Sequence, residues 1–278
     1  MTTPAPSKDR VRLDELLVAR GIAASGARAQ AMLLAGRVRV GRGDAARGDR
    51  KPGDRVVADI ELEVVAPEPY VSRGGHKLAA ALDSFGLDPA GRVCLDAGAS
   101  TGGFTDVLLQ RGARRVYAVD VGRGQLAGSI RHEPRVVVMD RTNARDLGPD
   151  RVGEPIELAV ADLSFISLRL VLGALASVLA IEADLVVLVK PQFEAGRDAV
   201  RGGVVRDPAV RAAAVAGVAA AAEAVGLRAS DVIASPLLGP AGNREFLLHL
   251  RRATGPADGV EREALVGRIA AVTGTAVP

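Results

Sequence analysis

Residues 93–104 read VCLDAGASTGGF, and residues 116–122 read VYAVDVG. Each segment begins with a short apolar run that lacks helical periodicity, which predicts a buried β-strand. The glycines after the first run let the backbone approach a ligand that a Cβ atom would exclude. From Phe104 to Gln110, apolar and polar residues alternate at helical spacing, so a helix N-terminus would face the glycine turn. This order of elements predicts a Rossmann-like α/β domain with a nucleoside site.

The second run ends at Asp120, twenty-two residues after Gly98, where an acidic residue can bind the hydroxyls of a ribose. The turn reads Gly-Ala-Ser-Thr-Gly-Gly, not the Gly-x-Gly-x-x-Gly pattern that seats a dinucleotide pyrophosphate. Asp96 adds a carboxylate near the place where NAD would put phosphate. S-adenosylmethionine, a cationic sulfonium without phosphate, therefore fits better. The alternative is an α/β turn that binds no nucleotide, because glycine motifs alone are weak signals.

The residues expected at S-adenosylmethionine lie in this turn and at the ends of neighbouring strands. Asp120 would hold the ribose hydroxyls, and the adenine would lie near Asp140, Arg141 and Asn143. The complete expected set is Asp96, Gly98, Ser100, Thr101, Gly102, Gly103, Phe104, Asp120, Asp140, Arg141, Asn143 and Asp162. No metal site is expected.

Composition limits the class of protein. The chain has 278 residues, of which 48% are apolar, and one cysteine, Cys94, inside a predicted buried strand. A disulfide within the chain is impossible, which favours a reducing cytoplasm. No basic-then-apolar signal precedes Arg10, and the most apolar stretch, 170–189, is interrupted by Glu182 and Asp184. We therefore expect a cytoplasmic protein with no membrane partner.

The excess positive charge is concentrated in the first quarter of the chain. Residues 1–66 hold 12 basic and 9 acidic residues, whereas residues 67–278 hold 24 of each. Val38 and Val40 alternate with Arg37 and Arg39, which predicts a half-buried strand with a cationic outer face. A concentrated basic face is typical of proteins that bind phosphate backbones. The alternative is a solvated arginine face without a ligand.

Two short helices are predicted in this region, one ending at Gly21 and one running from an N-cap at Ser25 to Gly36. A strand is predicted from Val56 to Val64. The region resembles the ribosomal S-four-type RNA-binding domain in RLDxxL (12–17), Gly21, Ser25, Arg28, Ala31, Leu34, Gly36 and VxV (38–40), and departs from it at Gly26, where a basic residue is usual. The basic face and the resemblance together predict RNA binding, and the residues expected to contact RNA are Arg10, Arg12, Arg20, Arg28, Arg37, Arg39 and Arg73.

Only four lysines occur in the chain, and two of them, Lys77 and Lys190, adjoin predicted ligand-facing loops. A partly buried lysine can lose its proton, whereas an arginine in a protein cannot. Lys190 and Asp162 each end an apolar strand, and Glu245 lies at the start of the last strand. Two amines and two carboxylates beside a sulfonium site suit deprotonation of a sugar hydroxyl. The alternatives are a solvated lysine, an Asp162 that caps the helix after Ser167, and a Glu245 that pairs with Arg244 or Arg251.

The chain resembles the TlyA family over essentially its whole length. The shared motifs are VSRGxHKL (71–78), LDAGASTGGFT (95–105), RTNAR (141–145), ADLSFIS (161–167), KPQFE (190–194) and GPxGNxE (239–245). The sequence departs at Glu68-Pro69-Tyr70-Val71, where mycobacterial members carry Arg-x-Trp-Val. TlyA proteins are FtsJ-like ribosomal RNA 2′-O-methyltransferases once labelled haemolysins, with a Lys-Asp-Lys-Glu tetrad. The resemblance places that tetrad on Lys77, Asp162, Lys190 and Glu245.

We therefore expect an α/β fold with a Rossmann-like seven-stranded methyltransferase sheet and a small N-terminal α+β RNA-binding domain. The expected parts are the RNA-binding domain (1–66), a linker (67–75), the methyltransferase domain (76–252) and a tail (253–278) with a helix near 260–271. Strands are expected near 92–97, 115–120, 135–139, 156–162, 184–190, 228–234 and 244–251, in a parallel sheet covered on both faces.

The expected activity is S-adenosylmethionine-dependent 2′-O-methylation of a cytidine in ribosomal RNA of the small subunit, the large subunit or both. Lys190 would accept the hydroxyl proton or stabilise the alkoxide, while Lys77 and Glu245 orient the ribose. The expected partner is ribosomal RNA or a ribosomal subunit, with no obligate protein partner. Two alternatives are a membrane-active haemolysin and an RNA-binding protein without catalysis.

Overall fold

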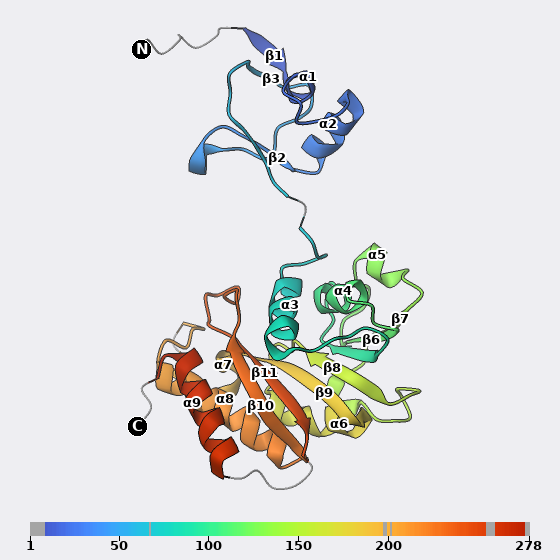
Figure 1. Ribbon diagram of the computed structural model, residues 1–278, viewed down its shortest axis with the longest axis vertical. Coiled ribbons are helices and arrows are strands. Elements are labelled where there is room, and N and C mark those ends of the chain that lie inside the picture. Colours follow the sequence, from blue (N-terminus) through green and yellow to red (C-terminus); the bar gives the residue numbers. More distant parts are fainter. Residues whose placement is uncertain (1–8, 67, 197–198, 201, 254–258, 276–278) are drawn as a thin grey trace. The chain divides into compact units, whose positions relative to one another are not determined.

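The computed structural model describes residues 9–66, 68–196, 199–200, 202–253 and 259–275. The chain forms two compact units, Met1–Pro69 and Tyr70–Pro278 (Figure 1). The predicted domain 1–66 and tail 253–278 each fall partly outside the described residues.

The N-terminal unit packs two short helices against two two-stranded sheets. Its elements are β1 (Arg10–Arg12), α1 (Leu13–Ala19), α2 (Gly26–Leu34), β2 (Val38–Val40), η1 (Gly43–Ala45), β3 (Arg55–Val57) and β4 (Leu62–Val64). Ser25 is the N-cap of α2, as predicted, and its Oγ accepts the Arg28 backbone N–H at 3.2 Å. The single strand predicted from Val56 to Val64 is wrong, because β3 pairs with β1 and β4 pairs with β2.

The C-terminal unit contains the seven-stranded sheet that the sequence predicted. Its strands are β5 (Val93–Ala97), β6 (Arg115–Asp120), β7 (Val136–Asp140), β8 (Ile156–Ala161), β9 (Leu179–Val189), β10 (Leu227–Ala234) and β11 (Phe246–Arg252). They lie in the order β10-β11-β9-β8-β5-β6-β7. Its helices are α3 (Gly74–Phe85), α4 (Gly103–Gln110), α5 (Gly128–Arg131), η2 (Ala144–Asp146), η3 (Leu168–Leu170), α6 (Leu172–Val178), α7 (Pro191–Glu194), α8 (Pro208–Glu223) and α9 (Gly259–Thr273). The Rossmann-like fold is confirmed.

One strand departs from the predicted parallel arrangement. β11 runs antiparallel to both of its neighbours, β10 and β9. The reason is the connection 235–245, which joins β10 directly to β11 and contains no crossover helix. Because Phe246 pairs with Val189, the residue before β11 lies beside the residue after β9. This reversal brings Glu245 to the carboxyl ends of the parallel strands.

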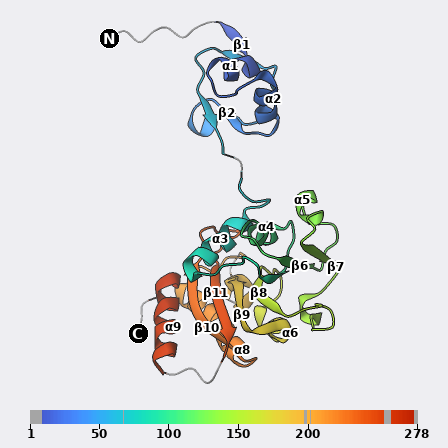
Figure 2. The same ribbon diagram turned by 45° about the vertical axis from the view of Figure 1, so that its right-hand side comes forward.

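Helices cover both faces of the sheet (Figures 1 and 2). On one face, α3 and α4 contribute Leu78, Leu82, Val107 and Leu108 to an apolar core. The core of the other face includes residues of α6, α8 and α9. α9 contacts α8 and β10, so the C-terminal helix belongs to this unit. The predicted two-sided α/β layering is therefore present.

Candidate active site

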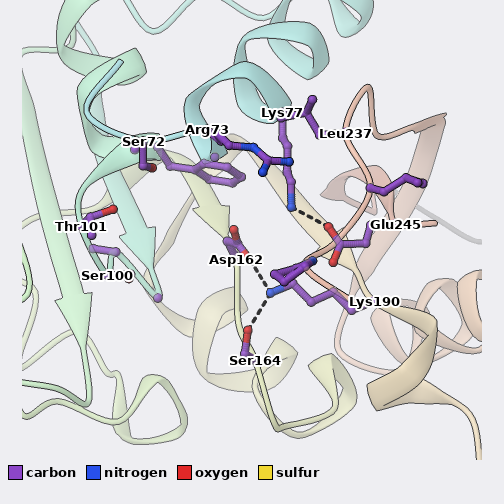
Figure 3. Close-up of a pocket in the computed structure, with 17 residues that line it drawn as sticks. Ser72, Arg73, Lys77, Ser100, Thr101, Asp162, Ser164, Lys190, Leu237 and Glu245 are labelled. Atoms are coloured by element: carbon purple, nitrogen blue, oxygen red, sulfur yellow. Dashed lines mark hydrogen bonds and ion pairs between the residues drawn. The ribbon is translucent and has the colours of Figure 1, made fainter. Parts of the chain in front are cut away.

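Four ionisable side chains converge at the carboxyl ends of the parallel strands (Figure 3). Asp162 follows β8, Lys190 follows β9, Glu245 precedes β11 and Lys77 lies in the first turn of α3. All four line one cavity of about 330 Å³. The other lining residues are Ser72, Arg73, Gly74, Gly98, Ala99, Ser100, Thr101, Gly103, Phe104, Ser164, Leu237, Leu238 and Pro240. The structure thus brings together the four side chains that the sequence assigned to the tetrad.

The four side chains form two ion pairs of different character. Lys77 Nζ donates to Glu245 Oε2 at 2.5 Å, and both side chains are buried. Lys190 Nζ lies 2.6 Å from Asp162 Oδ1 and donates to Ser164 Oγ at 2.7 Å. A buried ion pair persists when good geometry offsets the loss of hydration. The first pair therefore presents little net charge, whereas the second lies beside a hydroxyl.

The contacts of Asp162, Glu245 and Lys190 differ from those that purely structural roles would require. The turn after Asp162 is capped by Ser167, whose Oγ accepts the Arg169 backbone N–H at 3.3 Å. Glu245 pairs with Lys77, and Arg251 pairs with Asp184 instead. Lys190 is only 9% exposed, so it is not a solvated strand end.

A second cavity, of about 440 Å³, adjoins the first. The two share Gly98, Ser100, Asp162 and Ser164. Asp120 lines the second cavity, and its carboxylate accepts backbone N–H groups of Ser100 at 2.8 Å and Gly122 at 2.7 Å. The other lining residues are Val119, Val121, Gln125, Thr142, Asn143, Ala144, Leu163, Phe165, Ile166 and Val171.

The second cavity fits a cationic nucleoside without phosphate. Two carboxylates, Asp120 and Asp162, line it, and none of the residues lining it is a lysine or arginine. Gly98 has φ of +88°, and a Cβ atom there would collide with the Asp162 carbonyl oxygen. Glycine at this position therefore lets the turn pack directly against the backbone of Asp162. These features suit S-adenosylmethionine and disfavour a dinucleotide, whose phosphates need cations or free N–H groups.

Four of the residues predicted at the cofactor line neither cavity: Asp96, Gly102, Asp140 and Arg141. Asp140 faces Arg131 at 2.9 Å, which with other contacts lowers the pKa of Asp140. Asp96 lies fully buried beneath the turn, where it accepts from Thr105 N and Oγ1. Burial raises the pKa of Asp96 to about 7, and the charge of Asp162 acts in the same direction.

The predicted RNA-binding arginines fall into two groups. Arg73 lines the first cavity. In the N-terminal unit, Arg10 and Arg28 are exposed, but Arg12 is bound to Asp14 through two hydrogen bonds, and this contact lowers the pKa of Asp14 to about 2. Arg20 donates to two backbone carbonyls, Arg39 lies 3.9 Å from Glu63, and Arg37 is partly buried. Arg10 and Arg28 are therefore the arginines best placed to meet phosphate.

Ser164 and Phe165 line the cavities but were not among the predicted site residues. Phe165 lines the second cavity, is 91% exposed and has φ of +63°, an unfavourable backbone conformation for a bulky side chain. Its ring centroid lies 5.3 Å from that of Phe193. Strained residues cluster at functional sites. Two features of the sequence could have identified Ser164 and Phe165: they follow the apolar strand that ends near Asp162, and they belong to the ADLSFIS motif (161–167).

Known proteins resemble this chain across both units. A family model described as FtsJ-like methyltransferase matches residues 70–252. The 16S/23S rRNA (cytidine-2′-O)-methyltransferase TlyA of Mycobacterium tuberculosis is 52% identical over 246 residues, 88% of this chain and 91% of that protein. Hemolysin A of Brachyspira hyodysenteriae is 38% identical, over 86% of this chain and 99% of that protein. The resemblance to the TlyA family is confirmed.

A solved structure described as "Putative hemolysin from Streptococcus thermophilus" matches with a TM-score of 0.72 and 38% identity. The match covers 98% of this chain and 97% of that chain. Haemolysin names thus occur beside methyltransferase names among the relatives. Within the part of the chain that the structure describes, no helix is both long and apolar enough to cross a bilayer.

Proposed function

The chain belongs to the FtsJ-like methyltransferase family, and we propose that it methylates the 2′-hydroxyl of a cytidine in ribosomal RNA. The methyl donor of this family is S-adenosylmethionine. The observation that carries the proposal is the Lys77, Asp162, Lys190 and Glu245 cluster, which lines a cavity next to the one that suits the donor. A ribosomal substrate would place the reaction in the cytoplasm.

We assign the second cavity to the donor. Asp120 would bind the ribose hydroxyls, Asn143 would lie near the adenine, and Gly98 and Ser100 would border the sulfonium side. When bound, S-adenosylmethionine supplies an electrophilic methyl group on a positively charged sulfur. Asp162, which borders both cavities, would favour that charge.

We assign the first cavity to the target ribose. Lys190 would accept the proton of the 2′-hydroxyl or stabilise the forming alkoxide, because its amine lies in the cavity beside two acceptors. The Lys77–Glu245 pair would bind the ribose through hydrogen bonds and hold it in line for transfer. Because the pair is already neutral, it would add orientation without a second free cation near the sulfonium.

RNA would bind through cations and an exposed ring. Arg73 at the first cavity would contact a phosphate near the target nucleotide. Phe165 is almost fully exposed beside Ser164 and suits stacking with an unpaired base. Arg10 and Arg28 of the N-terminal unit would add affinity for the phosphate backbone.

We further propose that both ribosomal subunits are substrates. The Mycobacterium tuberculosis relative is named for both 16S and 23S RNA, and the match extends over 91% of its length. Mapping 2′-O-methyl marks on ribosomal RNA from a deletion strain and its complemented strain tests the proposal. We expect one cytidine mark to disappear from each subunit and return on complementation. Loss from one subunit only would reject dual specificity, and no loss from either would reject the ribosomal substrate.

A further inference from the structure

Ser164 is a residue outside the tetrad that contacts the proposed proton acceptor. It follows β8 by three residues, and its Oγ accepts a hydrogen bond from Lys190 Nζ at 2.7 Å (Figure 3). It also lines both cavities. We propose that Ser164 is a positioning residue that directs the Lys190 amine at the ribose hydroxyl. The inference rests on the proposed role of Lys190.

Asp162 and Ser164 contact the same amine in different ways. Asp162 Oδ1 lies 2.6 Å from Nζ, but it is buried and meets no described donor at hydrogen-bonding angles. The Ser164 hydroxyl accepts from the amine with hydrogen-bonding geometry. Asp162 therefore supplies charge, which attracts the lysine from any direction, and Ser164 supplies direction.

Direction matters because a neutral amine has two N–H bonds and one lone pair. The lone pair must face the ribose hydroxyl when the proton moves. The O–H bond breaks, the proton bonds to Nζ, and the oxygen keeps the electron pair with which it bonds to the methyl carbon. The electron pair of the broken C–S bond stays on sulfur, which becomes a neutral thioether. With one hydrogen donated to Ser164 and the nitrogen held beside the Asp162 carboxylate, Lys190 would present the lone pair to the cavity.

The Ser164 hydroxyl is held in place by contacts on both sides of its loop. Upstream, the Asp162 backbone N–H donates to the Ala97 carbonyl at 3.0 Å. Downstream, Glu194 accepts from Ser167 Oγ at 2.6 Å and from Leu168 N at 2.7 Å. Glu194 is on α7, which begins directly after Lys190. The loop that carries the serine and the helix that follows the lysine are therefore joined through Glu194.

The test compares Ser164→Ala with Ser164→Thr, which retains the hydroxyl. Steady-state methylation of RNA gives kcat and KM, and calorimetry gives the affinity for S-adenosylmethionine. We expect Ser164→Ala to lower kcat about 10- to 100-fold, the loss associated with one hydrogen bond to a charged group. KM for RNA and donor affinity should stay within about twofold, because Ser164 orients the amine and does not hold either substrate. Ser164→Thr should recover most of kcat.

The matched control is Ser177→Ala, an exposed serine on α6 that lines neither cavity; it should leave kcat unchanged. Because Ser164 is exposed, its truncation leaves no buried void, and thermal unfolding checks that the fold is kept. Parental kcat in Ser164→Ala, or equal losses in the alanine and threonine variants, would overturn the inference. Lys190→Arg is measured in parallel. If it too is fully active, the role of Lys190 fails; if it is inactive while Ser164→Ala is active, only the positioning role fails.

Discussion

Asp96 and Asp184 are both buried carboxyls of the central sheet, at 0% and 5% exposure, yet their pKa values move in opposite directions. Burial raises the pKa of Asp96 to about 7, and two hydrogen bonds from Thr105 only partly oppose it. Burial acts on Asp184 in the same sense but is outweighed by hydrogen bonds from His249, Arg92 and Arg251, so its pKa is lowered.

The difference lies in how completely each carboxyl is partnered. Asp184 accepts from Arg92 and His249 at 2.8 Å and from Arg251 at 2.9 Å, and Phe85 stacks on His249. Asp96 Oδ1 meets no described donor, although Asp96 Oδ2 accepts from Thr105. A polar network whose members all have hydrogen-bond partners specifies and stabilises a fold. A buried polar atom without a partner calls for another explanation, such as a role in a functional site. We therefore expect the carboxyl ends of the strands to serve function and the Asp184 cluster to serve stability.

Lys190→Arg is expected to have the largest effect, and that effect is on the rate of methylation. An arginine keeps the charge but cannot act as a base, so we expect the methylation rate to fall about 10²- to 10⁴-fold. That loss corresponds to roughly 3–5 kcal/mol of transition-state stabilisation. Binding of S-adenosylmethionine and RNA should persist, as measured by calorimetry and filter binding. Activity within a few-fold of the parent would leave Lys190 with an electrostatic role alone.

Asp184→Ala tests the stabilising cluster. It leaves Arg92 and His249 without their shared acceptor, so we expect the free energy of unfolding to fall by about 3 kcal/mol, measured by urea denaturation. The kcat of the folded protein should not change, because Asp184 lines neither of the two cavities. A variant that unfolds like the parent but has lost activity would reverse the assignment of the two clusters.

The sheet was predictable from the sequence because strands leave local patterns, whereas the tetrad was assigned through the family resemblance. Short apolar runs that end at Asp162 and Lys190 place charged side chains at strand ends whatever the rest of the fold. The direction of β11 was not predictable from periodicity, since a strand reads alike in either orientation. The pairing of Lys77 with Glu245 and the contact of Ser164 with Lys190 depend on that direction and on loop geometry. Contacts between residues this far apart in the sequence cannot be predicted from residue spacing.

Asp120→Ala tests the assignment of the second cavity to S-adenosylmethionine. The carboxylate holds the backbone of Ser100 and Gly122 and is proposed to bind ribose, so its loss should weaken S-adenosylmethionine binding by about 1–3 kcal/mol in calorimetry. Asp140→Ala is the matched variant, because Asp140 pairs with Arg131 and lines neither cavity. An equal loss in both variants would support adenine contact by Asp140, and unchanged binding in Asp120→Ala would remove Asp120 from the site.

The last expected effect is a pH dependence of stability that has opposite signs for the two aspartates. Asp184 has a lowered pKa, so its contribution to stability is complete above about pH 4, near the unfolded value, and is lost as the pH falls further. Asp96 has a raised pKa, so the folded state holds its proton more tightly than the unfolded chain does. Its contribution is therefore largest in acid and declines as the pH rises from about 4 to about 7.

Asp96→Asn tests the pH dependence of stability that comes from Asp96. The amide keeps the size of the side chain and the oxygen that accepts from Thr105, but it cannot ionise. The parent should lose stability relative to the variant between about pH 4 and pH 7, by at most about 1.4 kcal/mol per pH unit, in urea denaturation at each pH. Asp184→Asn should remove the loss of stability that the parent shows as the pH falls below about 4. If the difference between parent and Asp96→Asn stayed constant from pH 4 to 7, Asp96 would be ionised in the folded state. The Asp96 carboxylate beneath the glycine turn would then be negatively charged although Oδ1 meets no described donor. Asp96 and Asp184 would in that case differ only in how many hydrogen bonds they accept.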